Sequence, residues 1–450
     1  MAAISRERLQ ALHQREEASF RTLHPRSFEL SRRAQGSLLA GVPMPWMLRW
    51  TGGFPLFVAE GRGARFRDVD DRTYVDFCLG DTGAMSGHAP EATVMAVRRQ
   101  VERGLTFMLP TEDANAVAEN LAERFGLPYW QFTLSATDAN RFAIRWARAL
   151  TGRPKILVFN WCYHGTVDET FATLIEGRTV ARSGNVGPPV DLSLTTRVVE
   201  FNDIPALETA LREGDVACVL AEPVMTNIGI VHPQPGFHEA LRELTRRYSA
   251  LLILDETHTI SAGPGGYTAE YGLEPDILTV GKPIGGGVSA GAYGVSAEIA
   301  VRIIARTSLS EADTGGVGGT LAANALSLAA MRATLTDVLT PEAYRHATSV
   351  AERFEAGVRD VLTRRAVPFS VSRLGTRVEY IFRPEPPKNG SEGAAGQDAE
   401  LDAFLHLYCL NRGILMTPFH NMALMSRDTS AADVDLHTEV FAAAIDELLG

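Results

Sequence analysis

The sequence predicts an α/β protein: a mainly parallel β-sheet sandwiched by helices, joined to a smaller α+β part. The first observation behind this prediction is a set of five apolar runs that are too short for helices. These runs are KILVF, VACVLAE, LLILDE, ILTVG and GAYGVS. They are apolar throughout, as expected for strands buried on both faces of a parallel sheet. The second observation is that helical segments alternate with these runs, which is typical of an α/β sandwich.

The two ends of the chain follow other patterns and are expected to form the smaller part. Residues 1–35 predict a polar amphipathic helix, and the apolar stretches and turns of residues 57–77 predict antiparallel strands. After about residue 330, a long helical stretch leads to a strand candidate near residues 378–382. Residues 384–399 are rich in Pro, Gly and small polar residues, which predicts a mobile surface loop. The expected domains are 1–80 (N-terminal helix and small-domain strands), 81–330 (large domain) and 331–450 (C-terminal small domain).

Composition argues against several classes of partner. The 450 residues carry a formal net charge of −11 without a Lys/Arg cluster, so neither nucleic acid nor a membrane is expected as a partner. No apolar run reaches the length of a membrane span, and the charged N-terminal stretch lacks the apolar core of a signal peptide. The four cysteines form no C-x-x-C pair, and none has a His at metal-ligand spacing. We therefore expect a cytoplasmic, reduced protein with no metal site.

Two residues at the ends of predicted strands carry chemistry. Asp255 ends the run LLILD, and ligands of open α/β sheets bind at that edge. A carboxylate there is costly unless a cation pairs with it. Lys282 follows the next strand and precedes three glycines, so it could reach into a cleft where desolvation favours a nucleophilic amine. The simpler interpretations are a helix cap or loop Asp and a surface Lys. A P-loop is excluded, because the lysine precedes the glycines.

Two further segments could bind a flat, phosphorylated ligand. Ser135, Ala136 and Thr137 lie at a strand-to-helix turn, where N–H groups, hydroxyls and the positive dipole end form a phosphate site. A plain N-cap is the alternative. Tyr163 follows the strand KILVF in the cluster FNWCYHG, and it could stack on a flat cofactor or simply cap the core.

Taken in order, these features resemble the class III (ornithine-type) aminotransferase family of fold type I pyridoxal 5′-phosphate (PLP) enzymes. The resemblance runs from about Pro43 to the C-terminus. It is carried by S-x-T-D-A-N at 135–140, Y-H-G at 163–165, D-E at 255–256, G-K-x-I-G-G-G at 281–287 and G-T-L-x-x-N at 319–324. The pieces E-P-V-x-x-N-I-G and P-x-P-G-F, within 222–237, are most similar to glutamate-1-semialdehyde aminomutase and its aminotransferase neighbours.

The resemblance implies a PLP site and a role for each matching residue. Lys282 is expected to form the Schiff base with the cofactor and to move a proton in catalysis. Asp255 is expected to pair with the pyridine nitrogen, which makes the ring an electron sink. The other implied cofactor contacts are the phosphate turn Ser135, Ala136 and Thr137, the stacking Tyr163, Glu222 nearby, the ring-hydroxyl donor Asn227, Thr257 against the ring, and Thr320. The family pattern brings Thr320 to the neighbouring subunit's phosphate, so a homodimer with a shared active site is implied.

The chain departs from the family pattern where the substrate enters. The segment GVPMPWMLRW offers Trp46, with Arg49 close by in sequence. Phe419 and His420 stand where some relatives place a carboxylate-binding Arg. These residues predict an apolar, aromatic pocket for a hydrophobic or aryl-bearing amine or amino acid. An anion clamp at Arg49 or Arg377 is the alternative.

The leading hypothesis is a PLP-dependent aminotransferase that moves an amino group from a donor to a carbonyl acceptor by a ping-pong mechanism. The alternative keeps the cofactor and changes the reaction: an intramolecular aminomutase of the glutamate-1-semialdehyde type, or an amino-acid racemase. A non-catalytic binding protein of this fold would be expected to lack the lysine, and Lys282 is present.

Overall fold

The protein divides into two compact units, described here from a computed structural model that covers residues 4–188, 190–306, 308–418 and 420–450. The central unit comprises Glu91–Pro341 and Pro387–Ala395. The terminal unit comprises Met1–Pro90, Glu342–Pro386 and Gly396–Gly450. The borders expected at residues 80 and 330 fall close to Pro90 and Pro341, and the assignment of domains remains a prediction.

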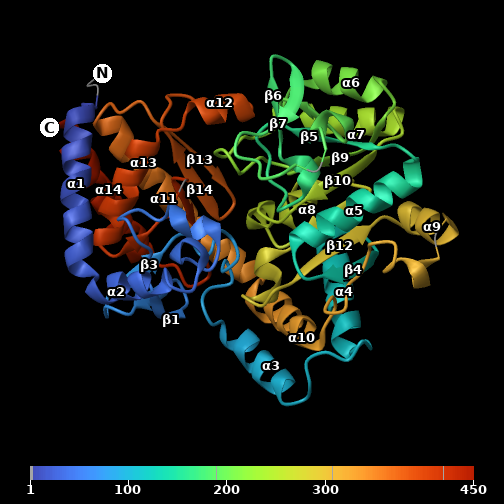
Figure 1. Ribbon diagram of the computed structural model, residues 1–450, viewed down its shortest axis with the longest axis horizontal. Helices are drawn as coiled ribbons and strands as arrows, with labels where there is room; N and C mark the ends of the chain where they lie inside the picture. Colours follow the sequence, from blue (N-terminus) through green and yellow to red (C-terminus); the bar gives the residue numbers. More distant parts are fainter. Residues whose placement is uncertain (1–3, 189, 307, 419) are drawn as a thin grey trace. The chain divides into compact units, whose positions relative to one another are not determined.

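A seven-stranded sheet forms the middle of the central unit, in the order β4-β12-β11-β10-β9-β5-β8 (Figure 1). The strands are β4 (Tyr129–Thr133), β5 (Lys155–Phe159), β8 (Thr196–Val199), β9 (Val216–Ala221), β10 (Leu251–Asp255), β11 (Ile277–Val280) and β12 (Gly291–Val295). Neighbours from β8 to β11 run parallel, whereas β12 is antiparallel to both of its neighbours. The five apolar runs are therefore strands, and the prediction of a mainly parallel sheet is confirmed.

Helices bury both faces of this sheet. Helices α5 (Ala136–Thr151) and α9 (Ala297–Arg306) share an apolar cluster with Leu251 and Ile253 of β10. Helices α6 (Ile204–Arg212) and α7 (Phe237–Arg247) share another with Leu252 and Leu254. Successive residues of a strand point to opposite faces. Because both faces are covered, the strands have no polar side, which explains why the runs are apolar throughout.

The central unit has further helices and one hairpin. They are α3 (Glu91–Val101), α4 (Glu112–Phe125), α8 (Gly266–Glu270), α10 (Ala325–Ala333) and the hairpin β6 (Ala172–Ile175) with β7 (Arg178–Ala181). None of the helices within the described ranges combines the length and the hydrophobicity that a membrane span requires.

The terminal unit holds two small sheets beside long helices. Its helices are α1 (Arg6–Leu23), α2 (Pro25–Ala34), α11 (Pro341–Arg364, starting at the border), α13 (Ala399–Asn411) and α14 (Ala431–Leu449). One sheet joins β1 (Val58–Arg62), β2 (Arg65–Asp68), β3 (Thr73–Asp76) and β15 (Ile414–Leu415); the other joins β13 (Ser370–Leu374), β14 (Arg377–Ile381) and β16 (Met422–Leu424). The antiparallel strands expected within residues 57–77 and the strand expected near 378–382 are confirmed.

Two expectations about local structure were wrong. The described residues 4–35 form two helices instead of one, because Pro25 starts a new helix at a position where its missing N–H costs nothing. Residues 384–399 are not simply a loop, since they contain α12 (Gly390–Ala395). Gly390 and Gly393 are there for close packing: a Cβ would lie 2.1 Å from the Asn160 carbonyl oxygen at the first and 2.3 Å from that of Ile228 at the second.

Candidate active site

The predicted site residues that follow β4, β5, β9, β10 and β11 lie at one edge of the central sheet. Asp255 ends β10 and pairs in register with Thr279 of the parallel strand β11, and Lys282 follows β11 by two residues. Strand β4 is antiparallel to β12, as β11 is, so β4 also ends at this edge, just before Ser135. The segments after β5 and β9, which carry Tyr163 and Glu222, emerge there as well. This is the carboxyl edge where open α/β sheets bind ligands.

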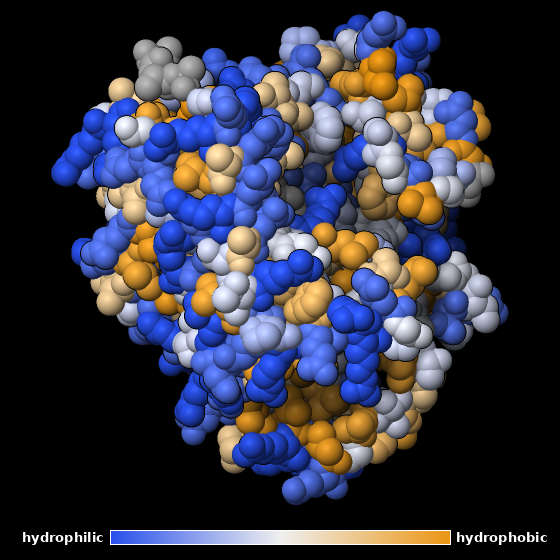
Figure 2. All heavy atoms as spheres, turned by 60° about the vertical axis from the view of Figure 1, so that its left-hand side comes forward, coloured by the Kyte–Doolittle hydropathy of each residue, from blue (hydrophilic) through white to orange (hydrophobic). Residues whose placement is uncertain are grey.

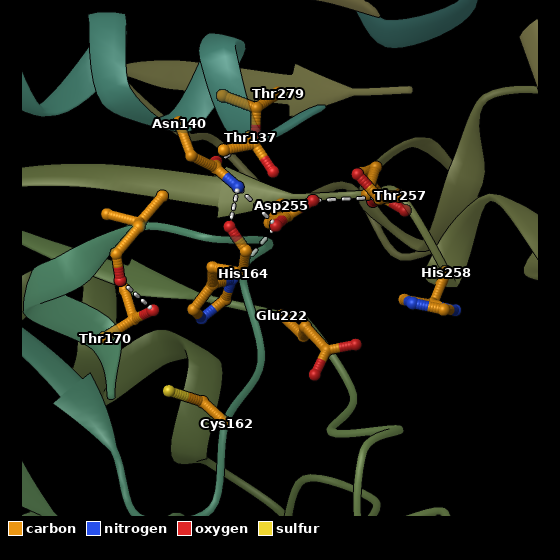
Figure 3. Close-up of polar contacts among 12 residues, drawn as sticks. Thr137, Asn140, Cys162, His164, Thr170, Glu222, Asp255, Thr257, His258 and Thr279 are labelled. Carbon is orange, nitrogen blue, oxygen red and sulfur yellow. Dashed lines mark hydrogen bonds and ion pairs between the residues drawn. The ribbon is translucent and has the colours of Figure 1, made fainter. Parts of the chain in front are cut away.

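Asp255 is buried and held by three donors (Figure 3). Its Oδ2 atom lies 2.9 Å from Nδ1 of His164 and accepts a 2.8 Å hydrogen bond from Nδ2 of Asn140. Its Oδ1 atom accepts the backbone N–H of Thr257 at 3.0 Å. Asn140 is fixed in turn, because its Oδ1 accepts a 2.7 Å hydrogen bond from the Thr279 hydroxyl. The carboxylate therefore has a fixed orientation at the end of its strand.

His164 supplies the cation that a buried carboxylate needs. Burial alone would raise the pKa of Asp255, but the hydrogen bond and charge of His164, with the Thr257 and Asn140 donors, lower it. Burial alone would lower the pKa of His164, but neighbouring Cys162 and the bond with Asp255 raise it. The two side chains therefore form an ion pair at neutral pH. In Figure 3, Cys162 lies on the side of the imidazole away from Asp255.

The turn at residues 135–137 opens helix α5 toward the same edge. Ser135 is the N-cap: its hydroxyl accepts the Asp138 N–H at 3.2 Å and donates to the Asp138 carboxylate at 3.0 Å. The simple N-cap interpretation is thus correct for the Ser135 side chain. The N–H groups of Ala136 and Thr137, in the first turn, have no partner inside the helix and point out of its positive end. They are the groups that could hold a phosphate.

Two glycines bring the neighbouring segments against this turn. A Cβ on Gly281, which precedes Lys282, would lie 2.9 Å from both N and Cβ of Ala136. A Cβ on Gly165 would lie 2.0 Å from the Thr137 hydroxyl, and the φ of Gly165 is +76°. The Thr137 hydroxyl also accepts the backbone N–H of Thr166 at 3.1 Å. The Y-H-G and G-K segments therefore depend on glycine to close around the helix start.

Lys282 adopts a left-handed backbone conformation, with φ +49°, which is uncommon for a residue with a side chain. Its Nζ lies 2.8 Å from Nε2 of His258, three residues past Asp255. Both side chains are partly buried. Strained backbone at a functional lysine is consistent with a side chain held in one direction for chemistry.

Glu222 and Asn227 bond within the protein. Glu222 is buried and accepts the Thr226 hydroxyl at 2.6 Å, and burial raises its pKa to about 7. Asn227 donates one amide N–H to the Trp161 carbonyl at 2.9 Å, so only its second N–H is available for the predicted ring-hydroxyl contact.

Tyr163, Thr257 and Thr320 differ in environment. Tyr163 is 37% exposed and meets Phe171 edge-on at 6.4 Å. The Thr257 hydroxyl is buried without a hydrogen-bond partner in the described ranges. Thr320 is exposed on the segment before α10. It does not cap that helix, since α10 begins at Ala325 and is capped by Asn324, whose side chain accepts the Ser327 N–H at 2.9 Å.

The residues predicted to contact the substrate belong to the terminal unit. Trp46 and Arg49 lie in the 3-10 helix Pro45–Arg49, where Trp46 meets Trp50 edge-on at 5.3 Å. His420 is buried, with Nδ1 3.0 Å from Glu379 Oε1. Phe419 lies outside the described residues. The Arg377 guanidinium is buried, 3.3 Å from both Asp81 Oδ1 and the Thr82 hydroxyl.

Sequence reasoning gave no role to three residues that the structure connects to the site. Asn140 and His164 stand inside the quoted motifs, and their place in those motifs was their only signal. The only sequence signal for His258 was its position, three residues after Asp255 at the end of a strand. In the described part of the chain, no three side chains of His, Cys, Asp or Glu lie close enough together to bind a metal ion.

The chemistry of the site fits PLP. The open N–H groups of α5 suit a phosphate, and an ionised buried carboxylate suits a protonated pyridine nitrogen. The buried Thr257 hydroxyl lacks a partner within the described residues, as expected of a group that faces a ligand. Lys282 supplies a primary amine for an aldehyde.

Comparison with known proteins supports the same family. Residues 47–442 match the family described as aminotransferase class III. Glutamate-1-semialdehyde 2,1-aminomutase 1 of Bacillus cereus is 35% identical over 93% of this chain and 97% of its own. A crystal structure described as a glutamate-1-semialdehyde aminomutase from Pseudomonas aeruginosa is 51% identical over 99% of both chains, with a TM-score of 0.97. An omega-transaminase from Sphaerobacter thermophilus is 31% identical over 94% and 98% of the chains, with a TM-score of 0.85. The chain is a member of the class III aminotransferase family, with a fold type I architecture and PLP as its cofactor.

Proposed function

We propose that the chain is an aminomutase of the glutamate-1-semialdehyde type. The observation that carries this proposal is the 51% identity, over 99% of both chains, to a structure described by that activity. The curated relative at 35% identity has the same description. These likenesses favour the intramolecular reaction over transfer from a hydrophobic or aryl amine, which was the leading hypothesis from sequence.

The reaction exchanges two groups on adjacent carbons of one molecule. The amino group leaves carbon 2, an amino group is added to the aldehyde carbon 1, and carbon 2 becomes the carbonyl. No second substrate is consumed. When bound, PLP withdraws electrons from the carbon that carries the amino group.

Each of the residues at the sheet edge has a task in this proposal. Lys282 binds the cofactor aldehyde through its amine and moves a proton between substrate and cofactor carbons. Asp255, kept ionised by His164, holds the pyridine nitrogen protonated. The N–H groups of Ala136 and Thr137 hold the phosphate, and Tyr163 stacks on the ring.

The decisive experiment offers the substrate with no amino acceptor. Purified PLP-loaded protein is incubated with glutamate-1-semialdehyde alone, and 5-amino-4-oxopentanoate is quantified by NMR. We expect turnover without an acceptor and its loss in Lys282→Ala. Absence of product, together with turnover of an aryl amine plus a keto acid, would contradict the aminomutase and favour the aminotransferase. That second candidate has support in the 31% identity to an omega-transaminase and in Trp46 at the predicted substrate entrance.

The lysine assignment has a direct test. The sequence contains only three lysines, Lys155, Lys282 and Lys388. Borohydride reduction of the PLP-loaded protein followed by peptide mapping should place the pyridoxyl label on Lys282. Lys155 is the internal control, because it already pairs with Asp215 at 3.2 Å. A label on Lys155 or Lys388 would contradict the assignment.

A homodimer completes the proposed site. Apolar side chains gather at the lower end of Figure 2, where Figure 1 draws α3 and the segment after it. The exposed apolar residues of this segment are Met95, Val101, Leu105, Phe107, Met108 and Leu109. A second copy of the chain is the proposed partner that covers them, since contiguous exposed apolar surface marks an interaction site.

A further inference from the structure

We infer that His258 is the proton-exchange partner of Lys282, and that it acts by positioning the lysine side chain and accepting a proton from its ammonium group. The inference rests on the proposed function only in taking Lys282 as the lysine that binds the cofactor aldehyde. It adds a residue that neither the motifs nor the comparisons assign.

The contact is direct. Nζ of Lys282 and Nε2 of His258 are 2.8 Å apart, which is hydrogen-bond distance between an amine and an imidazole. The two residues follow neighbouring parallel strands: His258 comes three residues after the end of β10, and Lys282 two residues after the end of β11. Both side chains are partly buried, so the contact is neither deep in the core nor fully in water.

The backbone on each side fixes this contact. Lys282 has its left-handed conformation directly after Gly281, which is packed on Ala136. On the other side, Asp255 and Glu256 anchor the chain that leads to His258. Glu256 is buried and accepts the Thr259 hydroxyl and the N–H groups of Tyr267 and Thr268. The lysine and the histidine are thus held from two rigid strand ends.

His258 is separate from the group that holds Asp255. In Figure 3 it lies beyond Thr257, and no hydrogen bond drawn there joins it to Asp255, His164 or Asn140. The site therefore has two histidines with different tasks. His164 fixes the charge on a carboxylate, whereas His258 faces the amine.

The chemistry of the pair is a balanced proton transfer. A lysine ammonium gives one proton to Nε2 of His258, which leaves a neutral amine and an imidazolium. The amine lone pair then attacks an aldehyde carbon, a carbon–nitrogen double bond forms, and the two remaining nitrogen protons leave with the carbonyl oxygen as water. The imidazolium returns its proton when the amine is released. Imidazole is suited to this task because its ordinary pKa lies close to neutrality.

The test measures the rate at which PLP condenses with Lys282 in cofactor-free protein, followed by absorbance. Borohydride quenching and peptide mapping confirm the lysine. His258→Gln keeps a polar side chain but cannot exchange a proton in this pH range. We expect condensation at neutral pH to slow by roughly 100-fold, within the range for general acid–base catalysis. His238→Gln is the matched control, a partly buried histidine of α7 whose ring packs on Tyr267 at 5.8 Å.

A second variant separates proton exchange from structure. In His258→Ala, added imidazole should restore much of the lost rate, which would not happen if the histidine only supported the fold. Equal rates for wild type, His258→Gln and His238→Gln, with no imidazole effect, would overturn the inference. That result would leave the proposed function intact as long as borohydride still labels Lys282. If wild-type Lys282 is not labelled, the cofactor assignment fails, and this inference fails with it.

Discussion

At the residue scale, the site depends on a buried ion pair more than on any single group. Asp255 would be a poor electron-sink partner if burial protonated it, and His164 prevents this by pairing with it at 2.9 Å. Asn140 and the Thr257 N–H donate two further hydrogen bonds to the carboxylate, and one lone pair of Oδ1 is left for a cofactor. A buried ion pair of this kind adds little net stability, because desolvation of the two charges offsets their attraction. Removing one partner is nevertheless destabilising, because it leaves an uncompensated buried charge.

The pH dependence of this pair follows from the direction of each shift. The pKa of His164 is raised, so its contribution to stability is complete below the ordinary histidine value and is lost as pH rises through the folded-state value. The pKa of Asp255 is lowered, so its contribution is present above the ordinary aspartate value and is lost as pH falls through the folded-state value. The pair therefore stabilises the fold most between about pH 4 and 6.5.

Replacing His164 should show this dependence. We expect His164→Phe to lower the free energy of unfolding of the cofactor-free protein by about 3–5 kcal/mol near pH 6. The loss should shrink as pH rises toward 10, where the wild-type histidine is itself losing its proton. Urea unfolding at several pH values measures both effects. A loss that does not vary with pH would mean that the imidazole contributes packing and not charge.

The same substitution at His437 is the matched control, because it should change the free energy of unfolding in the opposite direction. His437 is buried in the terminal unit, stacked on Phe354 at 4.2 Å, and neither ring nitrogen has a partner in the described ranges. Burial lowers its pKa to about 3, so it destabilises the fold as pH falls below the ordinary histidine value. His437→Phe should raise the free energy of unfolding by about 2 kcal/mol at pH 5 and change it little at pH 8.

At the element scale, glycines allow the segments after two strands to pack closely against the start of helix α5. The φ of Gly165 is +76° and a Cβ there would collide with the Thr137 hydroxyl. Gly281 packs directly against Ala136, where a Cβ would lie 2.9 Å from the Ala136 Cβ. The Ala136 methyl group fits at this contact because Gly281, which faces it, has no side chain.

Substitution of Gly165 tests this arrangement. We expect Gly165→Ala to weaken PLP retention at least 10-fold, because the helix start and the Y-H-G loop must separate. Gly126→Ala is the control: Gly126 ends α4 with φ +73° and has open space around it. It should cost only backbone strain, about 1 kcal/mol of stability, with PLP retention unchanged. Dialysis against buffer without PLP measures retention. Equal retention in both variants would show that the close approach is unimportant.

The strands could be predicted from sequence because burial on both faces leaves a strong local pattern, as in LLILD and KILVF. Asp255 and Lys282 could be found because each follows such a run. The packing of α12 could not be predicted, since its glycines meet Asn160 and Ile228 from far along the chain. His258 was missed for the same reason: its contact with Lys282 joins segments that follow two different strands, and no local sequence pattern reveals it.

At the scale of the whole molecule, the sequence motifs divide between the two units. The residues proposed to hold the cofactor all lie in the central unit, whereas Trp46, Arg49 and His420 lie in the terminal unit. The expectation of a pocket for hydrophobic amines was drawn from Trp46, Phe419 and His420, and Arg49 and Arg377 were the alternative anion clamp. His420 is paired with Glu379, and Arg377 with Asp81, so these side chains are already held by acidic neighbours. Residue type alone could not reveal those pairings.

Dimerisation is the last prediction, because the proposed phosphate site needs a second chain. Thr320 is exposed, and it caps no helix, since Asn324 caps α10. A phosphate with nearly two negative charges calls for more donors than one helix start supplies. We expect the PLP-loaded protein to sediment as a dimer at micromolar concentration. Thr320→Ala should weaken PLP retention by about 1–2 kcal/mol, whereas Thr320→Ser, which keeps the hydroxyl, should retain it. Thermal stability without PLP should not change in either variant. A monomer that is saturated with PLP and fully active would contradict the shared site.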